Sequence, residues 1–175
     1  MIERGSSTTY RYDMARRVTL QDILLQTRAR YVRLEPESAL AAMTSGALLL
    51  DIRDSDQRRR DGTIPGALII DRTVLEWRVD PDSGATHPAI PGLTTPLILI
   101  CNQGYASSLA VGSLLDLGAA SVTDVSGGFE AWRAAGLPIQ PAQKRPTLAD
   151  RRAARATASP PRRERASPRA GMTDQ

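Results

Sequence analysis

The sequence predicts an α/β protein in which a small, mainly parallel sheet carries helices on both faces. Residues 47–52 and 97–100 are almost entirely aliphatic, and strands without a polar face are typical of a parallel sheet that is covered on both sides. Segments with helical spacing alternate with these runs, as in parallel crossover units. The last 36 residues contain no aromatic residue, valine or isoleucine, so we expect a disordered C-terminal tail.

The N-terminal part of the fold is predicted to begin with two helices. Thr19 is a suitable N-cap for a short amphipathic helix over residues 20–30, because apolar residues follow it at helical spacing. Residues 31–34 have the composition of a short strand. Pro36 suits the first turn of a second helix, which we expect to run to about Thr44.

The middle of the chain is predicted to hold two buried strands and a short helix. The first strand is the aliphatic run at residues 47–52, and an Ile-Pro-Gly turn leads into the second at residues 67–70. Residues 73–79 look helical, and Arg72 and Glu76 stand one helical turn apart, which favours an ion pair.

The clearest crossover unit follows. The strand at residues 97–100 leads through a short loop into a helix that begins at about Ala106, a strand comes next at residues 121–125, and Gly127 precedes a last helix. Strand, loop, helix and strand in this order form a parallel unit. Three large aromatic residues are expected in the core: Trp77, Phe129 and Trp132.

Charge separates the tail from the rest of the chain. The net formal charge is +4, yet residues 140–175 hold nine basic and three acidic residues, so residues 1–139 are mildly acidic. We therefore predict three parts: a flexible segment at residues 1–18, a domain at residues 19–139 with a helical extension to about residue 35, and the tail at residues 140–175. No apolar run approaches the roughly 20 residues that span a bilayer, and a secretion signal is not apparent. We expect a cytoplasmic protein with no membrane partner.

The single cysteine, Cys101, follows the aliphatic strand at residues 97–100. Ligands of open α/β sheets bind at the carboxyl ends of strands. The N–H groups of a tight loop and of the helix after it converge on one point and stabilise negative charge there. Gly104 suits a loop that needs a positive φ. Cys101 is either a nucleophile or an inert packing residue. A single cysteine excludes an internal disulfide framework and a multi-cysteine metal site.

Four blocks of sequence resemble the rhodanese-like domain family of single-domain sulfurtransferases, in the order in which that family has them. The blocks are Leu50-Asp51-Ile52-Arg53, Gly62-Thr63-Ile64-Pro65-Gly66-Ala67, Leu97 to Ser107, and Gly127-Gly128-Phe129-Glu130-Ala131-Trp132 with Ala135-Gly136-Leu137-Pro138. The resemblance implies a rhodanese-like fold over about residues 36–140.

The resemblance also implies a function. Cys101 would take the outer sulfur of a small donor such as thiosulfate, hold it as a persulfide and pass it to cyanide, a thiol or a sulfur-accepting protein. The cysteine loop, which we define as residues 101–107, would bind the substrate and stabilise the persulfide anion. Besides Cys101 it consists of Asn102, Gln103, Gly104, Tyr105, Ala106 and Ser107. No metal and no other cofactor is implied.

The sequence departs from the family at two positions that affect charge. Many members have a histidine where this chain has Thr63 and an arginine where it has Ala106, and the cysteine loop carries no cation. A dianionic donor would therefore depend on arginines of neighbouring loops, such as Arg53 or Arg72, although we expect most of these to be solvated. Asp51 is predicted to accept hydrogen bonds from loop amides and to support the site together with Arg53.

Other functions stay open. Dual-specificity phosphatases and arsenate reductases share the architecture, but they need an arginine six residues after the cysteine, and that position is Ser107. A non-catalytic binding or regulatory module and a sulfur relay to a protein are further alternatives. The arginines of the tail could attract nucleic acid, but the tail lacks aromatic residues for base stacking, so nucleic-acid binding is not expected.

Overall fold

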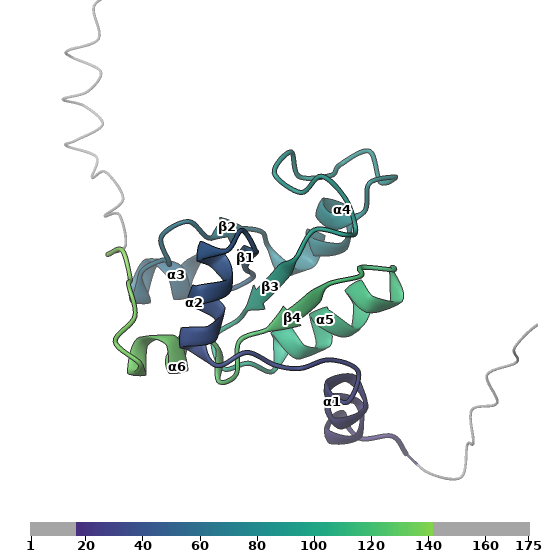
Figure 1. Cartoon of the computed structure of the whole chain (residues 1–175). Coiled ribbons are helices and arrows are strands. Elements are labelled where there is room, and N and C mark those ends of the chain that lie inside the picture. The colour runs from purple at the N-terminus through teal and green to yellow at the C-terminus, as the bar shows by residue number, and fades with distance from the viewer. Residues whose placement is uncertain (1–16, 142–175) are drawn as a thin grey trace, which may run out of the picture. The chain divides into compact units, whose positions relative to one another are not determined.

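The computed structural model describes residues 17–141, in which four parallel strands form one sheet in the order β2-β1-β3-β4 (Figure 1). The strands are β1 (Leu48–Asp51), β2 (Leu68–Ile69), β3 (Leu97–Ile100) and β4 (Val122–Asp124). In the centre, Leu48 pairs with Leu97 and Asp51 with Ile100. Because all strands run in one direction, their carboxyl ends lie at one edge of the sheet.

Helices cover both faces of this sheet, as predicted. They are α1 (Leu20–Arg28), α2 (Pro36–Thr44), α3 (Ser55–Asp61), the 3-10 turn η1 (Arg72–Val74), α4 (Leu75–Val79), α5 (Ala106–Asp116) and α6 (Gly128–Ala134). α2 packs against β1 and α6, whereas α5 packs against β3, β4 and α4. α1 lies against α5 and not against the sheet (Figure 1). Within residues 17–141, no helix has the length and apolar character to cross a membrane.

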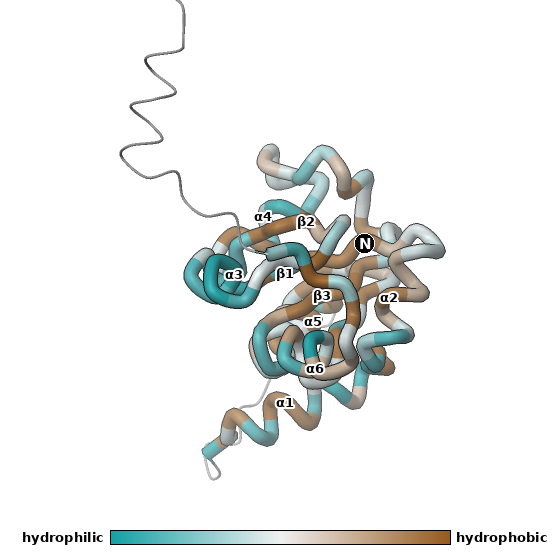
Figure 2. The backbone as a smooth tube through the Cα atoms, turned by 90° about the vertical axis from the view of Figure 1, so that its left-hand side faces the viewer, coloured by the Kyte–Doolittle hydropathy of each residue, from teal (hydrophilic) through white to brown (hydrophobic). Residues whose placement is uncertain are grey.

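Two hydrophobic layers result from alternation along the central strands. The central strands are hydrophobic along their length (Figure 2). Successive strand residues face opposite sides, so the apolar positions divide between α2 with α6 and α4 with α5. One layer contains Leu49, Ile98, Ile100, Ala39, Phe129 and Trp132, and the other contains Leu50, Leu97, Leu99, Leu75, Ala110, Val111 and Leu114. A fully buried leucine contributes about 1.5–3 kcal/mol, which makes these layers the main source of stability.

Local capping explains where several helices begin. Thr19 accepts from the backbone N–H of Asp22, and the Asp22 side chain accepts in return from the Thr19 backbone, which confirms the predicted N-cap. Asp54 and Gln57 form the same reciprocal pair at the start of α3. We did not predict α3, because it buries none of its residues and so has no apolar period.

The strand expected at residues 31–34 is wrong. Leu34 forms only a single parallel bridge with Val125, through hydrogen bonds to the carbonyl of Asp124 and from the N–H of Ser126. Val32 is 82% exposed, and the side chains of Tyr31 and Arg33 both hydrogen-bond Asp124. These two hydrogen bonds, and not pairing with a neighbouring strand, fix the conformation of this segment.

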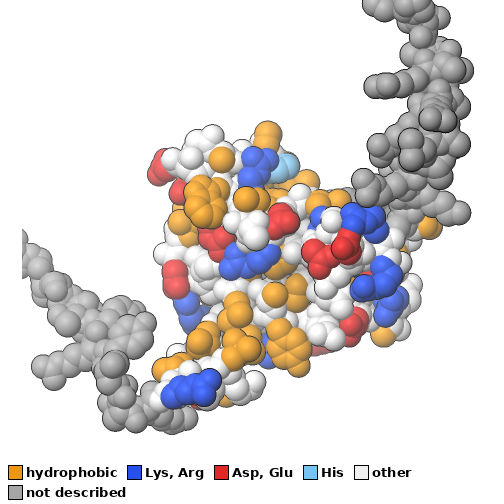
Figure 3. All heavy atoms as spheres, turned by 180° about the vertical axis from the view of Figure 1, so that it is seen from behind, with side chains coloured by type: hydrophobic (Ala, Val, Ile, Leu, Met, Phe, Trp, Pro, Cys, Tyr) orange, Lys and Arg blue, Asp and Glu red, His pale blue; other side chains and the backbone are white. Residues whose placement is uncertain are grey.

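Two predictions of burial also need correction. The expected apolar face of α1 is only partly buried: Leu24 and Thr27 are buried, whereas Leu20 and Ile23 are exposed, as part of an apolar area on α1 (Figure 3). Phe129 and Trp132 are fully buried, as expected, whereas Trp77 is 58% exposed on α4. The predicted tail, apart from residues 140 and 141, and the first sixteen residues lie outside the described residues.

Candidate active site

Cys101 lies at the carboxyl end of β3, in the position that the sequence predicts. It is 6% exposed, and its carbonyl accepts from the backbone N–H of Phe129 at 2.9 Å, which ties the start of the cysteine loop to α6. On the other side, Ile52 donates to the carbonyl of Ile100 at 2.9 Å. The cysteine is thus held between the ends of β1 and β3 and the start of α6.

The cysteine loop curls around the sulfur. The backbone N–H of Gly104 donates to Cys101 Sγ at 3.1 Å, and the thiol donates to Ser107 Oγ at 3.3 Å. Gly104 has φ 75°, as predicted. The side chains of Asn102 and Gln103 do not face the sulfur but bond Glu130 at 2.7 and 3.4 Å. The remaining residues lie at the start of α5: Tyr105 is its exposed N-cap, Ala106 lines the pocket and Ser107 is buried.

Asp124 organises the interior behind the cysteine loop, and sequence reasoning missed it. Its fully buried carboxylate accepts from Ser107 Oγ at 2.8 Å and Ser108 Oγ at 2.9 Å. It also accepts from Tyr31 Oη at 3.0 Å and from Arg33 Nε at 2.7 Å. Burial, with the neighbouring Asp124 carboxylate, raises the pKa of Tyr31 to about 12, so its hydroxyl stays a donor. The available signal was a carboxylate at the end of a strand, at the same edge of the sheet as Cys101.

Two arginines that precede the first strand in the sequence contact the cysteine loop on the side opposite the sulfur. Arg28 Nη2 and Arg33 Nη2 both donate to the carbonyl of Gly104, at 2.8 and 2.9 Å. Arg28 Nε also donates to Ser108 Oγ at 2.9 Å. The cysteine loop has no cation of its own, but two cations that lie 71 and 76 residues before Gly104 contact it.

Asp51 and Arg53 come together as a buried ion pair below the site. Arg53 donates to Asp51 through its backbone N–H at 3.1 Å and through Nη2 at 2.7 Å, and both side chains are 0% exposed. Asp51 therefore accepts from the loop after β1. Arg53 also donates to the carbonyl of Gly62 at 2.8 Å and stacks 3.6 Å from the ring centre of Phe129. The expectation of a solvated Arg53 is wrong.

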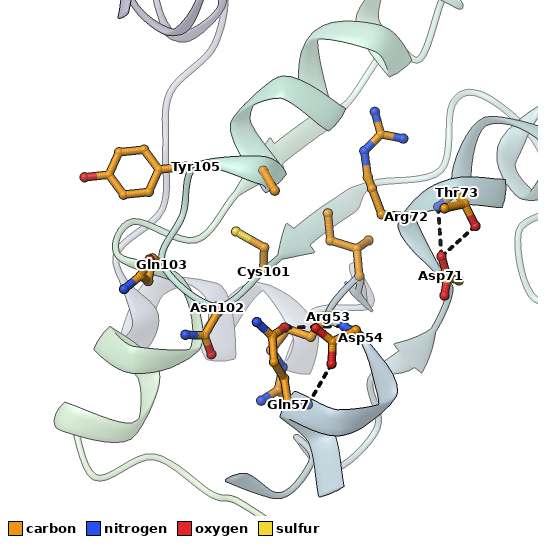
Figure 4. A pocket seen from close by; sticks show the side chains of 12 residues that line it. Arg53, Asp54, Gln57, Asp71, Arg72, Thr73, Cys101, Asn102, Gln103 and Tyr105 are labelled. Carbon is orange, nitrogen blue, oxygen red and sulfur yellow. Dashed lines mark hydrogen bonds between the residues drawn. The ribbon is translucent and has the colours of Figure 1, made fainter. Parts of the chain in front are cut away.

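A cavity of about 550 Å³ opens in front of Cys101. The cysteine loop forms one wall, and the segments at residues 52–57 and 71–73 form the other (Figure 4). Arg53 and Arg72 line this cavity, and Arg72 pairs with Glu76 at 2.9 Å, which confirms the predicted ion pair. A pocket of this size can admit a substrate larger than a simple anion. Within residues 17–141, no cluster of three or more His, Cys, Asp or Glu could hold a metal ion.

A family model and several known proteins match this chain. A family model described as Rhodanese-like domain matches residues 35–135. A thiosulfate sulfurtransferase GlpE from Pseudomonas savastanoi pv. phaseolicola is 35% identical over 104 residues, which cover 59% of this chain and 89% of the relative. A protein of the same name from Ectopseudomonas mendocina is 33% identical over 115 residues, or 66% of this chain and 95% of the relative.

A solved structure matches a larger share of the chain. This protein of unknown function from Rhodopseudomonas palustris, described as a possible tyrosine phosphatase, has a TM-score of 0.65 and 32% sequence identity, and the match covers 73% of this chain and 99% of that chain. Its match therefore covers more of this chain than the relatives above do.

Proposed function

Because this chain belongs to the rhodanese-like domain family, we propose that it is a sulfurtransferase that carries sulfane sulfur as a persulfide on Cys101. The observation that carries this proposal is the geometry around the sulfur: Cys101 lies at the base of an open cavity, and the Gly104 N–H points at its Sγ from 3.1 Å. An amide donor at this position stabilises negative charge on sulfur.

In the first step the Cys101 thiolate attacks the outer sulfur of a donor such as thiosulfate. A new S–S bond forms to Cys101, the S–S bond of thiosulfate breaks, and sulfite leaves with the electron pair of that bond. Cys101 then carries a persulfide anion, and the Gly104 N–H offers it a hydrogen bond. Arg53 and Arg72 line the cavity in which the dianion would bind.

In the second step an acceptor takes the outer sulfur. Cyanide attacks the terminal sulfur of the persulfide, the S–S bond breaks, and thiocyanate leaves while Cys101 recovers its electron pair as a thiolate. A thiol acceptor attacks the same atom and leaves as a persulfide. The sulfur atom that the donor gives up is the one that the acceptor takes, and Cys101 returns to its thiolate, so the cycle needs no oxidant, reductant or further reactant.

An intact-mass measurement tests this proposal. The purified protein incubated with thiosulfate is expected to gain the mass of one sulfur atom and to lose it on addition of cyanide, with thiocyanate released. Cys101→Ser, which keeps the size and a polar atom, is expected to show no mass gain. An unchanged mass of the native protein, or a gain that persists in Cys101→Ser, would sink the proposal.

A phosphatase is a second candidate, since a similar solved structure is described as a possible tyrosine phosphatase. Such enzymes need a cation six residues after the cysteine to hold the transferred oxyanion. Here Ser107 stands at that position, is fully buried and donates to Asp124. We therefore expect a generic aryl phosphate to give no turnover that depends on Cys101; release of the phenol by the native protein and not by Cys101→Ser would favour the phosphatase.

A further inference from the structure

Two guanidinium groups from outside the cysteine loop donate to the carbonyl oxygen of Gly104. Arg28 Nη2 donates at 2.8 Å and Arg33 Nη2 at 2.9 Å. A carbonyl oxygen has two lone pairs, and hydrogen bonds from ionised donors are roughly twice as strong as neutral ones. The orientation of this carbonyl is therefore set by side chains outside the cysteine loop.

That orientation also fixes the side of Gly104 that faces the sulfur. The N–H of Gly104 points at Cys101 Sγ, while its carbonyl points at the two guanidinium groups. The next peptide bond is trans, so the N–H of Tyr105 points away from the guanidinium groups. A Cβ at residue 104 would lie 2.7 Å from Arg33 Nη2 and 3.0 Å from the N of Gly127. The loop is thus packed tightly between the sulfur and Arg33.

Arg33 is held in place by Asp124, which is also linked to the sulfur through Ser107. Arg33 Nε and Nη2 bond the two oxygens of Asp124 at 2.7 and 2.9 Å. Asp124 in turn accepts from Ser107 Oγ, which lies 3.3 Å from Cys101 Sγ. Burial opposes the charge on Arg33, but its hydrogen bond and attraction to Asp124 raise its pKa above the ordinary value, and Cys101 acts in the same direction.

The two arginines come from a part of the chain outside the family match. Arg28 ends α1, and its guanidinium lies 5.5 Å from the ring centre of Tyr105. Arg28 and Arg33 both precede residue 35, where the match to the family model begins. The cysteine loop itself contains no lysine or arginine.

We propose that Arg28 and Arg33 are positioning residues of the sulfur-transfer site: they hold the Gly104 carbonyl outward and keep the cysteine loop closed around the sulfur. They also place positive charge behind the loop, where Arg33 offsets the buried Asp124 carboxylate and Arg28 adds a further charge. The proposal rests on the proposed function, in which a persulfide anion forms at this sulfur. The segment before the family region then supplies the cations that the cysteine loop lacks.

Alkylation of Cys101 tests the charge directly. The ratio of the rate with anionic iodoacetate to the rate with neutral iodoacetamide reports the positive potential at the sulfur. In Arg28→Met and Arg33→Met this ratio is expected to fall at low salt by about threefold or more. Arg30→Met is the matched control, because Arg30 pairs with Asp116 on the surface at 2.6 Å, and its ratio should stay at the native value.

Steady-state kinetics with thiosulfate and cyanide test the positioning. Arg33→Met is expected to lower kcat by about tenfold or more, since small displacements of a reacting group have large effects on rate. Arg33→Lys keeps the charge but not the planar fork, so it should keep the alkylation ratio and still have a reduced kcat. If Arg33→Met does not fold, Arg28→Met is used instead for both the alkylation ratio and kcat, and both are expected to fall.

Two outcomes separate the two proposals. If the native protein forms no persulfide with thiosulfate, the proposed function fails, whereas the alkylation ratios still measure the potential set by the arginines. If persulfide forms but Arg28→Met and the folded Arg33→Met match Arg30→Met in both ratio and kcat, the positioning role is refuted.

Discussion

Asp51 and Arg53 are two residues apart and form an ion pair from which solvent is excluded. Both side chains are 0% exposed, and the Arg53 guanidinium also bonds the Gly62 carbonyl and stacks on Phe129. Removing one charge from such a pair leaves the other buried without compensation, which is far more costly than losing an exposed pair. The pair therefore fixes the loop after β1, which forms one wall of the cavity.

Asp51→Asn tests this at the level of one residue. We expect it to lower the free energy of unfolding by about 3 kcal/mol or more, because Arg53 stays charged and buried. The matched control is Asp116→Asn, whose partner Arg30 is exposed, and its effect should stay below about 1 kcal/mol. Urea denaturation of both variants measures the difference; equal midpoints would mean that the buried pair contributes no more than the surface one.

Single residues differ in how far sequence alone could place them. Cys101 and Gly104 were predictable, since the one follows an aliphatic strand and the other is a glycine in a tight loop. Arg28 and Arg33, the arginine partner of Asp124, were not, because the hydrogen bonds of the two arginines to Gly104 and Asp124 join positions at least 71 residues apart in the chain, and local patterns carry no signal for such contacts. The sequence shows that the cysteine loop contains no cation, but it does not show that Arg28 and Arg33 contact the loop.

At the scale of elements, η1 and α4 are tied to α5 through one carboxylate. Glu76 accepts from Arg72 Nη1 at 2.9 Å and from Ser113 Oγ at 2.6 Å. Burial tends to raise the pKa of Glu76, but the hydrogen bond from Ser113 and the attraction of Arg72 outweigh it and leave the pKa below its ordinary value of 4.5. The ionised form is therefore favoured by folding.

Glu76→Gln is expected to lower stability by up to about 1 kcal/mol at neutral pH, a small value because the pair is partly exposed. Since the pKa is depressed in the folded state, this contribution is present above pH 4.5 and is lost as the pH falls through the folded pKa. Thermal unfolding of the native protein and the variant should thus converge in acid. Glu37→Gln, also in a first helical turn, controls for the helix dipole and should show a smaller difference.

Helices and strands were predictable where their buried residues leave a recognisable apolar pattern in the sequence. β3 and α2 have the expected bounds, because a fully apolar run and a proline at the first turn are strong signals. α3 has no buried residue, so it depends on its capping pair alone. The segment at residues 31–34 has the composition of a strand, yet two of its side chains bind Asp124 instead.

At the scale of the whole molecule, the C-terminal end of the described chain closes the fold. Gln140 exchanges two backbone hydrogen bonds with Thr63, at 2.8 and 2.9 Å, and a Cβ at Gly62 would lie only 2.4 Å from its carbonyl oxygen. Ile139 packs against the layer that contains Trp132. Residues 139 and 140 are thus part of the domain, and we propose that the residues after Pro141 are not required for it.

Two truncations test this boundary. A chain that ends at Pro141 is expected to keep the thermal transition and sulfur transfer of the full chain. A chain that ends at Pro138 loses the two hydrogen bonds to Thr63 and the contact of Ile139, at a cost of about 2 kcal/mol, and its Tm should fall by about 5 °C or more. A lower Tm for the chain that ends at Pro141 would place the boundary further along the chain.

The contact of Arg28 and Arg33 with Gly104 has a consequence for comparing members of this family. A comparison restricted to residues 35–135 would rank this chain among those whose cysteine loop has no neighbouring cation behind it, because neither guanidinium lies in that window. Two such chains with identical cysteine loops can therefore differ in how strongly they attract an anion, and the residues responsible would lie in the segment that precedes the shared region. Substrate preference in such chains is better compared in three dimensions than along the aligned loop.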